Sequence, residues 1–114
     1  MFLARVIGTV WATRKVESME GLKLLVVREL DADLKPKART LIAADVVQAG
    51  LGEIVLISTG SAARQSPQVD KTPVDSLVMA VVDNLQVKTE DDLEAAYVAR
   101  RDPIMAKLEQ QPEI

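Results

Sequence analysis

The first eighty-odd residues carry apolar side chains in short runs separated by turn signals, which is the pattern of a β-protein. Between residues 2 and 14 apolar residues recur at every second position, the period of a β-strand. Gly8 interrupts this run and predicts a bend or bulge of the kind that a small barrel needs in order to close. Further strands are predicted at residues 22–30, 40–47, 53–58 and 77–83.

The connectors before residue 58 carry no helical pattern, and the first helical signal follows Gly60. Ser61 is a predicted N-cap for one helical turn over residues 61–65, and a loop bounded by Pro67 and Pro73 comes next. Five short strands with one small helix predict a mainly β fold, a five-stranded Greek-key barrel of the OB type. We expect residues 1–88 to form this barrel domain.

The remaining residues, 89–114, change to a helical period. Thr89 followed by three acidic residues predicts a capped helix start, and the helix is expected over residues 90–101. Asp102 and Pro103 supply a break or a fresh start, so a second short helix is expected to end near residue 110. We therefore expect an acidic, helical C-terminal extension.

Three of the predicted strands are apolar on both faces, although an antiparallel barrel in water should alternate. They include residues 24–27, 54–57 and 77–82. Either the tail helix and the loops cover the outer faces, or the outer faces form a subunit interface. We favour the interface, because one short helix cannot cover three separate strands.

Charge and composition exclude several classes of function. Residues 1–85 carry ten basic and ten acidic residues, and residues 86–114 carry four and seven, so the net charge of −3 comes from the tail. A neutral body is a poor nucleic-acid binder. The chain has no cysteine and no histidine, which removes disulfides, thiolate metal sites and the usual general base.

The sequence shows neither the pattern of an N-terminal targeting signal nor that of a membrane-spanning helix. Arg5 interrupts the apolar N-terminus almost at once, and nowhere do apolar residues run for the ~20 positions that a membrane helix needs. We expect a cytoplasmic protein that binds neither membrane nor nucleic acid.

Candidate chemistry is sparse. Asp45 and Glu53 flank a glycine turn and could form a carboxylate pair, although each could equally accept backbone N–H bonds. Ser61 has no histidine to activate it. Trp11 is one of only three aromatic residues, too few for a stacking platform, and is assigned to packing or to an interface. We assign no catalytic, cofactor-binding or metal-binding residue and expect no cofactor and no reaction.

Four segments taken together resemble one family: VIGTVWATRK at 6–15, GLKLLVVREL at 21–30, AADVVQAGLGEIVLISTGSAAR at 43–64 and PVDSLVMAVVD at 73–83. They are similar to the EutN/CcmL family of bacterial microcompartment vertex proteins. The resemblance implies a non-enzymatic homopentamer of OB-like barrels that contacts hexameric shell proteins in the cytoplasm. Such pentamers close polyhedral shells, carboxysomes or metabolosomes, because a sheet of hexagonal tiles bends where pentagons are inserted.

The same resemblance implies which residues shape the ring interface. The predicted interface residues are Gly50, Gly52, Glu53, Gly60, Ser61, Ala62, Arg64 and Trp11. The simpler interpretation is that the glycines only permit a turn and that Arg64 is a surface residue. The alternative function is an OB-fold binding module for nucleic acid or peptide, and the third is a small hydrolase using Asp45 or Glu53. The tail departs from the family's usual end, and a subunit clamp, a contact with cargo and partial disorder all stay open for it.

Overall fold

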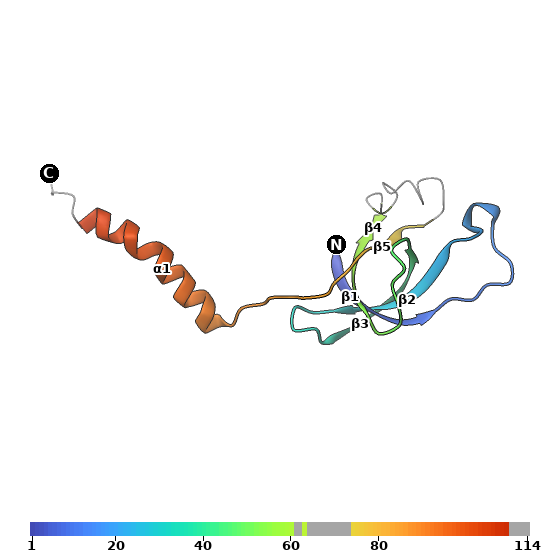
Figure 1. The fold of residues 1–114 in the computed structure, drawn as a ribbon, viewed down its shortest axis with the longest axis horizontal. Coiled ribbons are helices and arrows are strands. Elements are labelled where there is room, and N and C mark those ends of the chain that lie inside the picture. Colours follow the sequence, from blue (N-terminus) through green and yellow to red (C-terminus); the bar gives the residue numbers. More distant parts are fainter. Residues whose placement is uncertain (61–62, 64–73, 110–114) are drawn as a thin grey trace.

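The fold is a closed barrel of five strands followed by one long helix (Figure 1). The computed structural model describes residues 1–60, 63 and 74–109 of the chain. The barrel closes in the order β1-β2-β3-β5-β4, which confirms the predicted mainly β, OB-like Greek-key barrel. Its strands are β1 (Phe2–Thr9), β2 (Lys23–Leu30), β3 (Pro36–Asp45), β4 (Ile54–Thr59) and β5 (Ser76–Val81).

Strand pairing is antiparallel everywhere except between β3 and β5. These two strands run parallel, and their register pairs are Ala44 with Leu77 and Asp45 with Val78. The register of β1 on β2 shifts between Val6 and Gly8, where the glycine had predicted a bulge. The bulge makes the strand turn sharply, which lets a small sheet close on itself.

The ends of β3 differ from the prediction, because hydrogen-bonded pairing with the neighbouring strand sets them and the apolar pattern does not. β3 begins at Pro36 instead of residue 40 and ends at Asp45 instead of 47. Its first five residues are exposed and mostly polar, but they pair with β2 across a turn held by Asp31. The Asp31 carboxylate accepts the N–H groups of Asp33 and Lys35 at 2.9 and 3.0 Å. A polar strand end of this kind leaves no periodic trace in the sequence.

The segment between β1 and β2, residues 10–22, also differs from the prediction, and we call it the β1–β2 arm. The prediction continued the first strand to residue 14, but β1 ends at Thr9 and the chain leaves the barrel as a projecting arm (Figure 1). The arm contains a single 3-10 turn, Glu17–Met19, where no helical connector was expected. Gly21, the glycine of this arm, has φ +76°. This conformation favours glycine at the point where the chain turns back toward β2.

The core fills the barrel with small and branched apolar side chains. All five strands and the turn before β4 contribute to it: Ala4, Val6, Leu25, Val27, Ala43, Ala49, Val55, Ile57 and Val78. A second cluster lies outside the barrel, over the β3–β5 pairing, and contains Ala44, Ala63, Val74 and Leu77. Leu22, Leu24 and Val46 pack around this second cluster.

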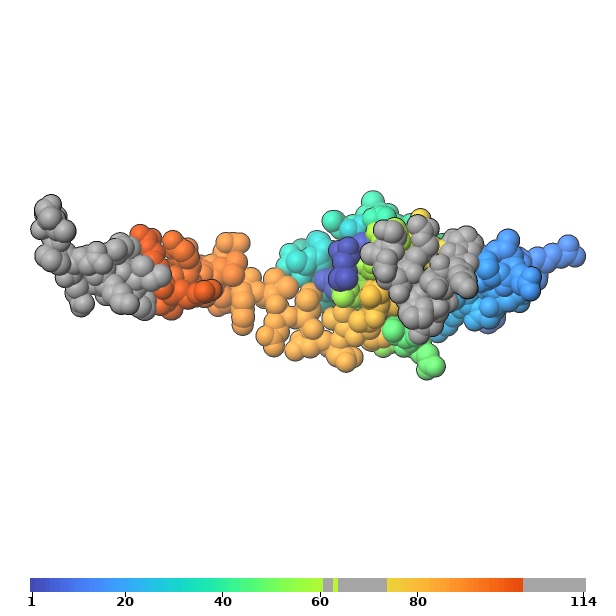
Figure 2. Space-filling view, turned by 90° about the horizontal axis from the view of Figure 1, so that it is seen from above, coloured from blue at the N-terminus to red at the C-terminus, as the bar shows by residue number. Residues whose placement is uncertain are grey.

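The C-terminal helix α1 (Glu90–Glu109) stands away from the barrel at the end of an extended linker (Figures 1 and 2). It is one continuous helix, so the predicted division into two at Pro103 is wrong. The helix continues although an interior proline removes one backbone donor and crowds the carbonyl four residues before it. Residues 83–101 are exposed throughout. No helix in the described residues is both long and apolar enough to cross a membrane.

The start of α1 is built as its sequence predicts. The Thr89 hydroxyl accepts the N–H of Asp92 at 3.1 Å, and the Asp92 carboxylate accepts the N–H of Thr89 at 3.3 Å. This reciprocal pair satisfies amides that a helix end otherwise leaves free.

Candidate assembly surfaces

One apolar surface lies on the outside of β1, β2 and β3. Gly8, Val26 and Ile42 are register neighbours across these strands, and the residues beside Val26 and Ile42 along β2 and β3 pack in the core. Ile42 is 47% exposed, and so is Ile7 at the bulge of β1. We call Ile7, Val26 and Ile42 the Ile42 surface.

A second apolar surface lies on the outside of β1, β4 and β5. Leu3, Leu56 and Ala80 are register neighbours and are half-buried. Met79, at the irregularity of β5, is 41% exposed beside them. We call Leu3, Leu56, Met79 and Ala80 the Leu56 surface.

The two surfaces confirm the expectation that several strands are apolar on both faces. They use opposite ends of β1 and otherwise different strands, so they lie on two sides of the barrel. The helix α1 covers neither, because it stands away from the barrel (Figure 1). A barrel with two different apolar sides is suited to a head-to-tail ring, in which each subunit presents one side to each neighbour. Full burial of a Val, Leu or Ile side chain contributes about 1.5–3 kcal/mol.

Trp11 stands on the β1–β2 arm and is 91% exposed. Of the two alternatives given for Trp11, this exposure excludes packing within the described residues of its own chain, and the interface stays a prediction. It lies at the edge of an open cavity of about 500 Å³ between the arm and the start of β2. The cavity is lined by Thr9, Val10, Trp11, Ala12, Lys15, Leu22, Lys23 and Leu24.

The glycine turn between β3 and β4 is bonded to β1 of its own chain. The N–H of Gly52 donates to the Val6 carbonyl at 2.8 Å, and the N–H of Val6 donates to the Glu53 carbonyl at 3.0 Å. Arg5 Nε donates to the Gly52 carbonyl at 2.9 Å, and the N–H of Gly50 donates to the Glu53 carboxylate. Gly52 has φ +85°. These contacts give the turn a role within the subunit, and its predicted role between subunits stays a prediction.

The second predicted motif begins at Gly60, which has φ +66° and donates its N–H to the Asp75 carbonyl at 2.7 Å. Ser61, Ala62 and Arg64 lie outside the described residues. Ala63 is fully buried in the cluster that covers the β3–β5 pairing. The motif therefore packs one residue, Ala63, inside the subunit, a role that the interface hypothesis did not include.

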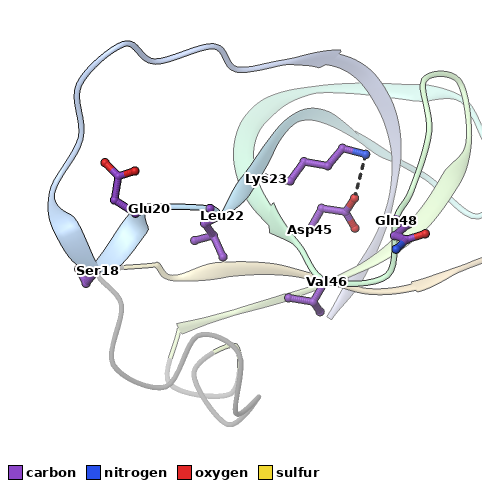
Figure 3. Close-up of a pocket in the computed structure, with 8 residues that line it drawn as sticks. Ser18, Glu20, Leu22, Lys23, Asp45, Val46 and Gln48 are labelled. Atoms are coloured by element: carbon purple, nitrogen blue, oxygen red, sulfur yellow. Dashed lines mark ion pairs between the residues drawn. The ribbon is translucent and has the colours of Figure 1, made fainter.

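Asp45 and Lys23 form a buried-to-surface ion pair that sequence reasoning missed (Figure 3). The Asp45 carboxylate accepts the N–H groups of Val47 and Ala49 at 3.1 and 2.9 Å and lies 3.4 Å from Lys23 Nζ. Lys23 Nζ also donates to the Ala49 carbonyl at 2.9 Å. The only signal was the spacing of Gly21 and Lys23 in the family motif, which gives no hint of the partner.

An open cavity of about 420 Å³ lies beside this pair (Figure 3). It is lined by Ser18, Glu20, Gly21, Leu22, Lys23, Asp45, Val46 and Gln48. Both carboxylates of the hypothetical catalytic pair, Asp45 and Glu53, hold backbone amides of the β3–β4 turn. This geometry favours the structural interpretation of the pair. Among the described residues no group of three metal-binding side chains comes together.

Comparison with known proteins agrees with this architecture. The family model described as ethanolamine utilisation protein EutN/carboxysome matches residues 1–83. The bacterial microcompartment shell vertex protein GrpN of Rhodospirillum rubrum is 48% identical over 86 residues, which cover 75% of this chain and 97% of GrpN. The solved structure of GrpN, titled a pentameric microcompartment shell protein, superposes with a TM-score of 0.71 at 44% identity and covers 77% of this chain and all of that one. CcmL of Gloeobacter violaceus superposes with a TM-score of 0.74 at 43% identity and covers 77% and 91%.

Proposed function

Because the chain belongs to the EutN/CcmL family, we propose that it is a structural shell protein, a homopentamer that caps the vertices of a bacterial microcompartment. The observation that carries this proposal is the match to GrpN, whose whole length aligns with the barrel of this chain and whose structure is pentameric. The protein then resides in the shell of a carboxysome or metabolosome inside the cell, as its relatives do.

The two apolar surfaces support a ring physically. In a five-fold ring the Ile42 surface of one subunit faces the Leu56 surface of the next, and both leave water in one heterologous contact. The ring has no free apolar side left, since every subunit uses both surfaces. A ring of fixed size is what a shell needs at a vertex.

The partners of the ring are the hexameric shell proteins, which meet it along its rim. The protein carries out no reaction of its own, because Asp45 and Glu53, the two carboxylates considered for catalysis, hold backbone amides and its relatives are shell vertex proteins.

Native mass spectrometry of the purified full-length protein tests the ring. We expect a sharp five-subunit species, which Ile42→Asp and Leu56→Asp each convert to monomers by placing a charge in the contact. Leu34→Asp is the matched control, because Leu34 is 38% exposed in the β2–β3 turn and has φ 64°, which aspartate tolerates. A stable wild-type monomer would overturn the proposal and favour the OB-fold binding module.

Electron microscopy tests the vertex role. Co-production of the chain with hexameric shell proteins is expected to give closed polyhedra, and the two interface variants are expected to give open sheets or tubes. Closed shells in the absence of any five-subunit species would contradict the role in closure.

A further inference from the structure

The helix α1 is an addition to the family's barrel. The family model ends at residue 83, and GrpN aligns over its whole length without using the last quarter of this chain. The pentamer of GrpN therefore forms without an equivalent of α1. A ring of the GrpN type therefore does not require the added helix.

One face of α1 combines apolar and acidic side chains. Glu90, Leu93, Glu94 and Tyr97 follow the i, i+3, i+4, i+7 spacing and lie along one side of the helix. Leu93 is 50% exposed and Tyr97 57%, and the Arg101 guanidinium lies 5.9 Å from the Tyr97 ring centroid. In proteins most helical stability comes from packing of one face against a partner. Leu93 and Tyr97 have no such cover in the described residues, which makes this face a candidate contact surface.

The barrel carries a matching feature of opposite charge. Arg5 on β1 and Arg28 on β2 are direct register partners, so their side chains share the outer face. Arg5 Nε donates to the Gly52 carbonyl and Arg28 Nε to the Lys37 carbonyl at 2.8 Å, which holds both guanidinium groups in place. Like charges directly opposite on a sheet repel each other. In the described part of the chain the ion pairs are those of Lys23 with Asp45 and Lys37 with Glu29, so neither arginine is neutralised there.

Apolar residues adjoin the two arginines. Ile54 is the register partner of Arg5, and Val82 donates its N–H to the Ile54 carbonyl. Both residues are half-buried on the barrel. A helix face on which Leu93 and Tyr97 alternate with Glu90 and Glu94 therefore finds both an apolar contact and two cations in one row of the sheet.

We propose that α1 of one subunit docks through the Glu90–Leu93–Glu94–Tyr97 face onto the Arg5–Arg28 pair of the neighbouring subunit, so that each chain clasps the next. This inference rests on the proposed ring. Arg5 lies on β1 between the Ile42 and Leu56 surfaces, and Arg28 lies beside it on β2, which places the pair at the margin of the contact with another copy.

The length of the linker and the direction in which it leaves the barrel favour docking of α1 on a neighbouring subunit over docking on its own barrel. The linker, residues 83–89, spans at most about 25 Å when extended. The molecule measures 27 and 22 Å across its two shorter axes, so an adjoining barrel lies within reach of the linker and helix together. In Figure 1 the linker carries α1 away from its own barrel, to which it makes no docked contact. A bundle of five α1 helices is disfavoured, because it would bring five acidic starts together.

Site-specific cross-linking tests the clasp, because the chain has no cysteine of its own. Thr40→Cys places a thiol beside Arg28, its register partner, and Arg101→Cys places one next to Tyr97 on α1. Full-length chains carrying one cysteine each are co-produced with different tags and treated with a short bifunctional thiol reagent. We expect a product that joins the two tags.

The charge contacts are tested in the same rings. Glu94→Lys in the Arg101→Cys chain should lower the yield of this product about tenfold. Asp91→Lys is the matched control, because it makes the same charge change on another side of the helix and should leave the yield unchanged.

Three results would overturn the clasp while leaving the ring intact. They are the absence of any product that joins the Thr40→Cys chain to the Arg101→Cys chain, a cross-link between two Arg101→Cys chains, and equal yields for Glu94→Lys and Asp91→Lys. Native mass spectrometry of the same samples separates these results from a failure of the ring, which would show as a mass below five subunits.

Discussion

The barrel and the C-terminal helix are stabilised by different kinds of contact. In the barrel, residues far apart in the sequence meet: Val6 exchanges hydrogen bonds with Gly52 and Glu53, and Ile57 is fully buried. In α1 the hydrogen bonds at the start join Thr89 to Asp92 and Leu93, a few residues away, and the side chains over residues 90–101 are exposed. The barrel is therefore stabilised by contacts between residues distant in the sequence, whereas α1 is stabilised by local hydrogen bonds and leaves its described side chains free for a contact with a partner.

This difference predicts that substitutions separate into two classes. Changes in the barrel should alter the free energy of unfolding, and changes in α1 should alter only helix content and binding. Each of the following variants is measured at one protein concentration, because the stability of an oligomer depends on concentration.

Ile57→Ala should have the largest effect. Ile57 is 0% exposed in the core, and its truncation is expected to lower the free energy of unfolding by about 2–5 kcal/mol in chemical denaturation. Val98→Ala is the matched truncation on α1, because Val98 is 40% exposed and lies off the face of Leu93 and Tyr97. It should change the barrel transition by less than about 0.5 kcal/mol. Equal losses would show that barrel and helix unfold as one unit.

Asp45→Ala should follow, with a loss of about 2–3 kcal/mol. The substitution leaves the amides of Val47 and Ala49 without an acceptor and Lys23 without its counter-ion. Asp45→Asn keeps an oxygen acceptor and should lose less. A neutral result for Asp45→Ala in a denaturation curve would contradict the structural role given to this carboxylate.

Gly52→Ala should cost about 1–2 kcal/mol, because φ +85° is unfavourable for a residue with a Cβ atom. Gly8→Ala provides the control, since its added Cβ would lie 3.6 Å from the Val26 side chain, an ordinary contact, and should cost less. The ring mass of both variants also tests the predicted interface role of the turn. A ring lost in Gly52→Ala at preserved fold would support that role.

Thr89→Ala should have the smallest effect on the barrel. Loss of the cap weakens α1 by about 1 kcal/mol, which circular dichroism detects as reduced helix content. The melting temperature of the barrel should stay unchanged. A lowered melting temperature would indicate that α1 already supports the barrel.

The sequence was most informative where local pattern decides structure. Apolar periodicity predicted five strands, Gly8 predicted the bulge, and Thr89 predicted the helix start. The outward apolar positions on several strands were also predictable, because runs without alternation must place apolar side chains on both faces.

What could not be predicted depends on contacts between distant residues. The polar start of β3 is set by its pairing with β2, and no apolar period records it. The pair of Lys23 with Asp45 and the opposition of Arg5 to Arg28 depend on strand register, which a single sequence does not fix. Pro103 shows the converse error, since a strong local signal predicted a break that the helix does not have.

The short pairing of β3 with β5, which we call the seam of the barrel, has a consequence for the stability of the protein at low temperature. Only Ala44–Leu77 and Asp45–Val78 pair β3 with β5 in the described residues, and the apolar cluster over them supplies the remaining contact. Apolar contacts weaken on cooling, whereas the longer hydrogen-bonded ladders depend on them less. Near freezing, protection of amides from hydrogen exchange, measured against the intrinsic rate at that temperature, should therefore fall first in β5 at this seam, and cold-stored protein should open there before β1 or β4 loosens.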